Sequence, residues 1–132
     1  MAGAEDVVRS FCKAVSRRDA SLVRALLTAD VVYHNVGMPA ANGVDDVVAS
    51  IEGQWQMFSG AYEFRVLNIA SAGDVVLTER VDVIGAEGRA CTVPVMGAFE
   101  VRDGGIARWR DYFDMALVAK MMSGEDVSTL VP

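Results

Sequence analysis

Three stretches of the chain carry apolar residues at helical spacing. In residues 5–17 and 44–58 the apolar positions recur at steps of three and four, as on one face of an amphipathic helix. Asp19 can cap a short helix between them, which we expect to end near Thr28. An extended segment over residues 31–36 and the turn-rich bridge GMPAANG separate this second helix from the third. The apolar positions are Val7, Val8, Phe11, Cys12 and Val15, then Leu22, Val23, Leu26 and Leu27, then Val47, Val48, Ile51, Trp55 and Phe58.

From Tyr62 onward the pattern is that of strands. Residues 62–69, 75–84, 90–101 and 106–113 form four extended segments, separated by the turn sequences SAGD, GAEGR and RDGG. We predict a meander of consecutive antiparallel strands, followed by a last helix over residues 115–122. Helices followed by strands predict an α+β fold. We expect a cone-shaped, curved, mixed or antiparallel sheet with the N-terminal helices packed on its concave face.

The composition indicates one ordinary domain over residues 1–132. The chain is 52% hydrophobic, yet no apolar run could span a bilayer, and its start lacks the features of a signal peptide, so we predict a cytoplasmic protein with no membrane contact. A formal charge of −6 without a basic cluster argues against nucleic acid as a partner. Cys12 and Cys91 are expected to be reduced, buried thiols. No metal-binding spacing such as HExxH or CxxC occurs, so we expect neither a metal nor another cofactor.

The strand predicted over residues 75–84 carries two charged side chains on one face. Side chains two positions apart in a strand share a face, so Arg80 and Asp82 point the same way. The opposite face of this strand is the more apolar of the two. Taken alone, the strand therefore predicts that Arg80 and Asp82 face solvent.

The last predicted strand indicates the opposite direction. Asp111 shares its face with Trp109 and Phe113, which predicts an apolar environment for this carboxylate. If the hairpins bring the strands together, Asp111, Arg80 and Asp82 meet in one interior, where the guanidinium can bond both carboxylates. A low-dielectric cavity then favours one proton held between the two aspartates. One aspartate can take a proton from water while the other gives one to a substrate oxygen, and the residues alone leave open which does which.

The short sequence YHN supplies two further polar side chains. Tyr33 and Asn35 share a face of the extended segment, and a phenol with a carboxamide can hold a water molecule in a fixed orientation. His34 points the other way, and we expect it to be a structural or surface residue rather than a catalyst or a metal ligand.

The motifs YHN, ERVDV, VMGAFEV and WRDYFD, in this order and separation, resemble the limonene-1,2-epoxide hydrolase family. Its members are small dimeric enzymes of the nuclear transport factor 2-like and SnoaL-like superfamily, whose cone-shaped fold the ketosteroid isomerases share. The resemblance implies direct activation of water, with Asp111 as general base, Asp82 as general acid toward the epoxide oxygen, and Arg80 as the bridge between them. It also implies that Tyr33 and Asn35 help to position the water.

The same resemblance implies one-step hydrolysis of a hydrophobic epoxide to a vicinal diol by a homodimer that needs no cofactor. The residues expected to line the substrate cavity are Ile84, Val93, Val95 and Phe113, with Trp109 as a wall and Met57 or Phe58 from the third helix. Two alternatives stay open, a ketosteroid-isomerase-like enzyme and a non-catalytic small-molecule binding protein of the same fold. In the second of these, Asp82 and Asp111 belong to a structural ion-pair network.

Overall fold

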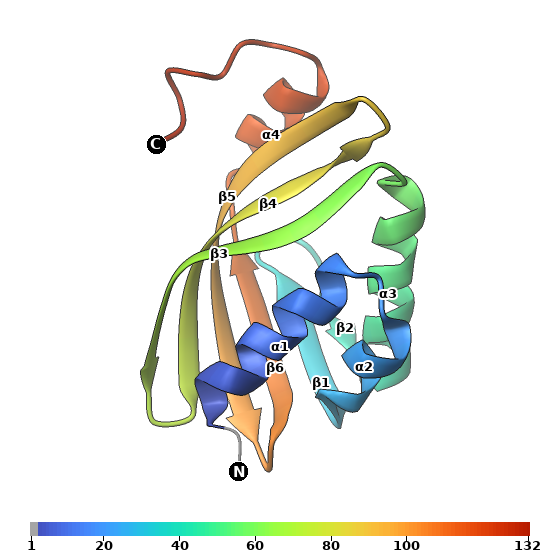
Figure 1. The fold of residues 1–132 in the computed structure, drawn as a ribbon, viewed down its shortest axis with the longest axis vertical. Coiled ribbons are helices and arrows are strands. Elements are labelled where there is room, and N and C mark those ends of the chain that lie inside the picture. The colour runs from blue at the N-terminus through green and yellow to red at the C-terminus, as the bar shows by residue number, and fades with distance from the viewer. Residues whose placement is uncertain (1–2) are drawn as a thin grey trace.

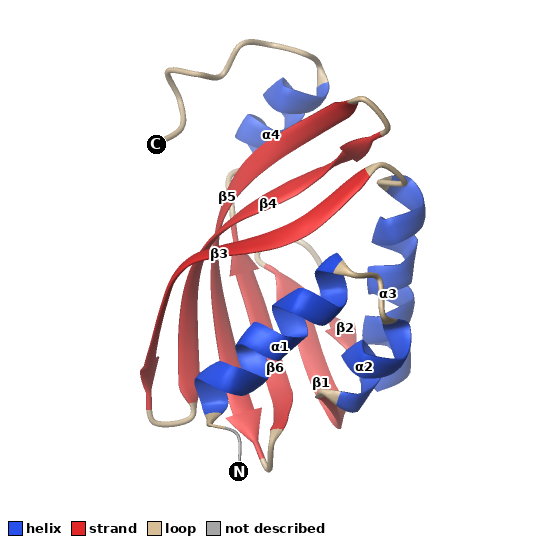
Figure 2. Cartoon of the chain, in the orientation of Figure 1, coloured by secondary structure: helices blue, strands red, loops and turns tan. Residues whose placement is uncertain are grey.

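One curved sheet with helices on its concave face forms the protein, as a computed structural model describes it for residues 3–132 (Figures 1 and 2). Helices α1 to α3 lie along that face, and α4 lies beside β5 near the end of the β4–β5 hairpin. This arrangement confirms the predicted α+β fold. The elements are α1 (Ala4–Ser16), α2 (Ala20–Ala25), β1 (Leu27–Asn35), β2 (Ala41–Asn42), α3 (Val44–Met57), β3 (Ala61–Ala72), β4 (Val75–Ala86), β5 (Arg89–Arg102), β6 (Gly105–Tyr112) and α4 (Met115–Met122).

The strand order of the sheet is β2-β1-β6-β5-β4-β3. The last four strands form the predicted antiparallel meander, and β1 joins β6 in parallel, which makes the sheet mixed. The parallel pairing sets Tyr33 beside Trp109 and Asn35 beside Asp111. Residues from the two ends of the chain therefore enter the same part of the interior.

The buried face of α1 agrees with its apolar stripe. Val7, Val8, Phe11, Cys12 and Val15 are all buried against the sheet. Phe11 packs edge to face on Trp109, with ring centroids 5.0 Å apart, and such pairs add to the energy of area burial. Cys12 is buried and Cys91 half-buried, and both are free thiols.

Two element boundaries near the start of β1 differ from the sequence prediction. Helix α2 ends at Ala25 rather than near Thr28, because Leu27 pairs with Ile106 of β6 and the Ile106 amide donates to the Leu26 carbonyl at 2.8 Å. The bridge GMPAANG contains the short strand β2, whose residues pair with β1. The first difference arises from pairing with a residue that is remote in the sequence, and the second from pairing across the bridge itself; a local pattern of apolar spacing contains neither.

Helix α4 lies loosely at the end of the molecule. Asp114 caps it by accepting hydrogen bonds from the amides of Ala116 and Leu117, at 2.9 and 3.1 Å. None of its residues is fully buried, although most are apolar. Among residues 3–132 there is no helix with the length and apolar character needed to cross a membrane.

Candidate active site

The polar face of β4 points into the protein. Thr78, Arg80 and Asp82 are buried, with Arg80 only 1% exposed, whereas Val75 and Leu77 on the more apolar face are 37% and 49% exposed. The prediction drawn from this strand alone, that its charges face solvent, is therefore wrong. The direction that β6 indicated is the one found.

A glycine on β5 lets the charged residues of β4 and β6 meet. Gly97 lies between Thr78 of β4 and Asp111 of β6 in the strand register. The Arg80 side chain passes over Gly97, where an added Cβ would stand 2.4 Å from Nη1 of Arg80 and 2.9 Å from Oδ1 of Asp111. No side chain fits in that space, so glycine at this position of β5 is what allows Arg80 of β4 to contact Asp111 of β6.

Arg80 holds both aspartates at once. Its Nε and Nη2 donate to the two oxygens of Asp82 at 3.0 Å each, and its Nη1 and Nη2 donate to the two oxygens of Asp111 at 3.0 and 2.9 Å. The second hydrogen of Nη1 points to Oγ1 of Thr78 at 3.4 Å. All five guanidinium hydrogens are thus used, as a buried arginine requires.

Trp109 packs against this cluster in the core and does not form a cavity wall. It has no exposed surface, and its indole N–H donates to Oδ1 of Asp111 at 2.8 Å. Its ring stacks on Tyr33 with centroids 3.8 Å apart, and the Phe64 ring lies 4.4 Å from the guanidinium carbon of Arg80. The Trp109 side chain lies two positions from Asp111 on the same inward face of β6. It is fully buried, so it fills the core next to the carboxylate and does not border the cavity.

The environment raises the proton affinity of one acid. Burial raises the pKa of Asp82 to about 6, with a contribution from the charge of Asp111 and against the opposing effect of Arg80. Burial alone would lower the pKa of Arg80, but the carboxylates of Asp111 and Asp82 raise it well above its ordinary value, so it stays charged. Asp82 therefore holds a proton at a higher pH than an exposed aspartate does. The single proton held between the two aspartates stays a prediction.

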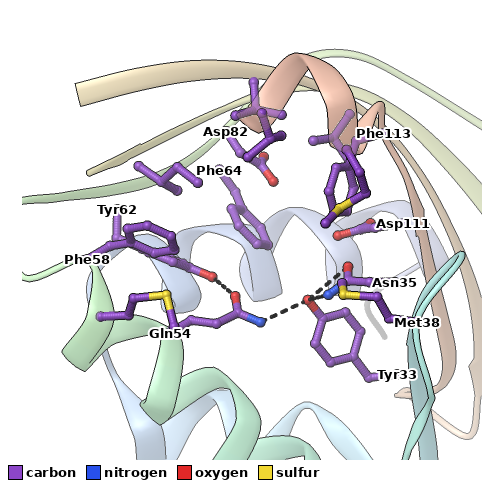
Figure 3. Close-up of a pocket in the computed structure, with 16 residues that line it drawn as sticks. Tyr33, Asn35, Met38, Gln54, Phe58, Tyr62, Phe64, Asp82, Asp111 and Phe113 are labelled. Carbon is purple, nitrogen blue, oxygen red and sulfur yellow. Dashed lines mark hydrogen bonds between the residues drawn. The ribbon is translucent and has the colours of Figure 1, made fainter. Parts of the chain in front are cut away.

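Both acids open onto one cavity of about 430 Å³ (Figure 3). Tyr33 and Asn35 lie near Asp111, with Asn35 Nδ2 3.0 Å from Tyr33 Oη, and Asp82 lies on another part of the wall. The predicted lining residues Ile84, Val93, Val95 and Phe113 all border it. His34 does not border it. The remaining lining residues are Met38, Gln54, Met57, Phe58, Tyr62, Phe64, Met115 and Val118.

Comparison with known proteins identifies the family. Residues 2–123 match the family model of the limonene-1,2-epoxide hydrolase catalytic domain. The chain belongs to the limonene-1,2-epoxide hydrolase family. It is 35% identical to epoxide hydrolase EphG of Mycobacterium tuberculosis (strain ATCC 25618 / H37Rv) over 125 residues, which cover 95% of this chain and 83% of EphG. The resemblance and the enzyme class that the motifs predicted are thereby confirmed at the level of the family.

Solved structures agree with this family and with the superfamily fold. A limonene-1,2-epoxide hydrolase-like epoxide hydrolase from M. tuberculosis matches with a TM-score of 0.83 and 32% identity, covering 98% of this chain and 96% of that one. A nuclear transport factor 2-like protein of unknown function from Burkholderia pseudomallei K96243 matches with a TM-score of 0.81 and 23% identity, covering 93% and 99%. The second likeness concerns the fold alone.

Two polar residues that sequence patterns did not indicate enter the cavity of this limonene-1,2-epoxide hydrolase family member. Gln54 lies on α3 next to the buried Trp55, and Tyr62 is the second residue of β3. The Tyr62 hydroxyl donates to Oε1 of Gln54, and Nε2 of Gln54 donates to Tyr33 Oη at 3.2 Å. The polar Gln54 beside an apolar helix stripe was the one available signal, and it is common on ordinary surface helices.

Proposed function

We propose that this chain is a cofactor-independent epoxide hydrolase that adds water directly to a hydrophobic epoxide and releases a vicinal diol. The observation that carries this proposal is the buried Arg80 bonded to two carboxylates that both face one apolar cavity. An arginine in this position fixes an acid and a base at a set distance while keeping both oriented toward the substrate.

In the proposed reaction, Asp111 is the general base and Asp82 the general acid. Asp111 takes a proton from water as the water oxygen bonds to an epoxide carbon. The C–O bond of the ring breaks, and the ring oxygen takes the proton of Asp82. The raised pKa of Asp82 supports this assignment because a general acid must hold its proton before the reaction. The triad gains one proton and loses one, so its total charge is unchanged.

The water is proposed to lie between Asp111 and the pair Tyr33 and Asn35. These two side chains are hydrogen-bonded to each other beside Asp111 and border the same cavity. A water there can give one hydrogen to Asp111 and keep its second hydrogen and one lone pair bonded to the pair. Its other lone pair is then directed at the substrate.

The nature of the cavity supports an apolar epoxide as the substrate class. Apart from the acids and the amide and phenol groups already named, its lining is aliphatic, aromatic or methionine. Methionine side chains adapt to different shapes, and Met38, Met57 and Met115 lie on this wall. Terpene, cycloalkene, styrene and fatty-acid epoxides form a suitable panel for ranking substrates.

The ketosteroid-isomerase alternative finds no support in Arg80. Isomerisation next to a carbonyl requires donors for an oxyanion. All the guanidinium hydrogens of Arg80 are occupied by Asp82, Asp111 and Thr78, so it has none to offer. Ultraviolet absorbance on an enone substrate tests this alternative directly.

We further propose that the protein acts as a homodimer that packs through the outer face of its sheet. That face carries an outer apolar patch, and the C-terminal Val131 and Pro132 lie against part of it. Side chains of this size exposed together on a sheet are typical of an interface between subunits. The patch consists of Leu67, Val75, Leu77, Met96 and Tyr112, which are between 37% and 53% exposed.

The decisive variant is Asp111→Asn, tested in labelled water. The amide keeps the size of the side chain but cannot accept a proton, so we expect a folded protein whose kcat falls at least about a thousandfold. The matched control is Asp74→Asn at an exposed turn, which should keep full activity. In wild-type single turnover in ¹⁸O-water, the label should enter the diol. Label delivered instead from a protein carboxylate would establish a covalent ester and contradict the proposal.

A further inference from the structure

A chain of hydrogen bonds crosses one wall of the cavity. It runs from Tyr62 on β3 to Gln54 on α3, and on to Tyr33 and Asn35 on β1 (Figure 3). The proposed acid and base chemistry uses Tyr33 and Asn35 but assigns nothing to Gln54 or Tyr62. Gln54 and Tyr62 lie at the end of this row of hydrogen bonds that is farther from Asp111.

The Gln54 and Tyr62 end of this row of hydrogen bonds is contacted by Arg18. Tyr62 is only 6% exposed. Arg18 donates to the carbonyls of Trp55 and Phe58 at 2.6 Å each, which fixes the last turn of α3 directly after Gln54. The guanidinium carbon of Arg18 also lies 5.8 Å from the centre of the Tyr62 ring. Arg18 therefore contacts both the backbone that follows Gln54 and the ring of Tyr62.

We propose that Gln54, oriented by Tyr62, is a positioning residue that sets the direction of the hydrogen bonds around the attacking water. The inference rests on the proposed function, because the water concerned is the one that Asp111 activates. Gln54 acts through Tyr33 and does not itself touch the reacting atoms.

The donors and acceptors around Tyr33 explain why its direction matters. The phenol oxygen has one hydrogen and two lone pairs, and the Gln54 amide occupies one lone pair. Either Tyr33 donates to Asn35 Oδ1 and keeps a lone pair for the water, or Asn35 donates to Tyr33 and leaves the phenol hydrogen free. In both cases the pair offers the water an acceptor together with a donor, which is either the phenol hydrogen or an amide hydrogen of Asn35. A water that gives its other hydrogen to Asp111 needs that pair.

The reversed amide would change this arrangement. With Oε1 of Gln54 facing Tyr33, the phenol hydrogen would go to the amide, and Asn35 would have to donate to Tyr33. The water would then lose the phenol hydrogen as a donor, Tyr33 could only accept from it, and the second amide hydrogen of Asn35 would be the one donor left beside acceptors on Tyr33, Asn35 and Asp111.

Tyr62 selects the productive orientation. Burial, followed by the neighbouring Tyr33, raises the pKa of Tyr62, so its hydroxyl keeps a hydrogen that needs an acceptor. Oε1 of Gln54 is that acceptor. Reversing the amide would leave this buried hydrogen without a partner, which carries the cost of an unsatisfied donor.

The substitution Gln54→Glu tests the direction with almost no change in shape. The carboxylate offers two acceptors and takes the hydrogens of both tyrosines, so we expect kcat to fall about a hundredfold at pH 8, as for a misplaced reacting group. When the new carboxyl is protonated it again donates to Tyr33. The ratio of variant to wild-type kcat should therefore rise as the pH falls through the pKa of that carboxyl. Burial and the charges of Asp82 and Asp111 raise this pKa, and the charges of Arg80 and Arg18 oppose the rise. Gln56→Glu, an exposed change on the same helix, should give a flat ratio.

A mutant cycle supplies a second test that needs no buried charge. Tyr62→Phe frees the amide to rotate, and Gln54→Met removes its hydrogen bonds at similar volume. Because Tyr62 acts only through Gln54, Tyr62→Phe should lower kcat in the wild type and have no further effect when Gln54→Met is present. Additive losses would instead mean that the Tyr62 hydroxyl and Gln54 act independently of each other, and would overturn the inference.

The outcomes separate this inference from the proposed function. A wild-type protein that opens no epoxide of the panel refutes both. An active wild type that loses activity with Asp111→Asn, while Gln54→Glu follows the wild-type pH profile or changes only KM, refutes the positioning role and leaves the proposed chemistry intact. Acid recovery of kcat with Gln54→Glu, together with a non-additive cycle, supports both.

Discussion

In strand β4 the polar face is buried and the more apolar face is exposed, the reverse of the usual arrangement. The face that carries Thr78, Arg80 and Asp82 is buried, and the face that carries Val75 and Leu77 is half exposed. In an ordinary surface strand, apolar residues face the core and charges face water. The reversal here places two carboxylates and an arginine in the interior of the cone, where the proposed chemistry would occur. It also leaves an apolar outer surface that a second protein molecule can cover.

The buried face depends on charge balance, and removing Arg80 should break it with the largest effect. Arg80→Met keeps most of the side-chain volume but leaves Asp82 and Asp111 buried without their shared cation. We expect the free energy of unfolding at pH 7.5 to fall by about 3–5 kcal/mol, as for a broken buried ion pair. The loss should shrink toward pH 5, where protonation removes charge from the pair. Urea unfolding at both pH values measures it.

Arg65→Met is the matched control for that experiment. Arg65 lies on the neighbouring strand β3, is exposed, and pairs with Glu63 at 3.0 Å. Exposed ion pairs contribute little, so this variant should stay within about 1 kcal/mol of the wild type. Equal losses for Arg80→Met and Arg65→Met would mean that the buried network is not what stabilises the inner face.

The helices and the strand meander could be predicted from the sequence because their signals are local. The stripe from Val7 to Val15 and the turns between strands give spacing and punctuation that hardly depend on distant residues. The start of β1 could not be predicted, because Leu27 continues the apolar pattern of α2 and only its pairing with Ile106 makes it a strand residue.

The burial of the candidate site could be predicted only by weighing the pattern of β6 against that of β4. The pattern of β4 gave the wrong direction for Arg80, and the position of Asp111 between the aromatic residues Trp109 and Phe113 gave the right one. Gly97 and Gln54 escaped prediction for a common reason. Their importance comes from what lies across the sheet or the cavity from them, which residue type and spacing do not record.

The free energy of unfolding should also depend on pH through Asp82 on the inner face of β4, with a smaller effect than the loss of Arg80. Because the pKa of Asp82 is raised from 3.8 to about 6 in the folded protein, its contribution to stability is complete below about pH 3.8 and is lost as the pH rises through 6. The full difference corresponds to about 3 kcal/mol, of which about 1 kcal/mol falls between pH 5 and 7.5. Asp82→Asn mimics the protonated acid and should lack this loss. Urea unfolding of both proteins at the two pH values isolates it, and parallel pH profiles would contradict the raised pKa.

The outer face should show the smallest effect on the folding of one chain and a clear effect on assembly. Leu77→Glu combined with Met96→Glu places two charges on half-exposed positions of the outer apolar patch. Since these side chains are not part of the core, we expect the protomer to lose no more than about 1 kcal/mol. Charges facing each other across the proposed two-fold interface should raise the dissociation constant of the proposed dimer at least about a hundredfold, which sedimentation velocity can measure.

Leu22→Glu provides the control for the outer face, because Leu22 is 41% exposed on α2 and lies outside the patch. It should leave the dimer intact. A dimer that survives the Leu77 and Met96 changes but dissociates with Leu22→Glu would move the interface to the helical side. In that case the exposed apolar residues of β4 would need another explanation, and the reversal of its two faces would reflect the demands of the inner site alone.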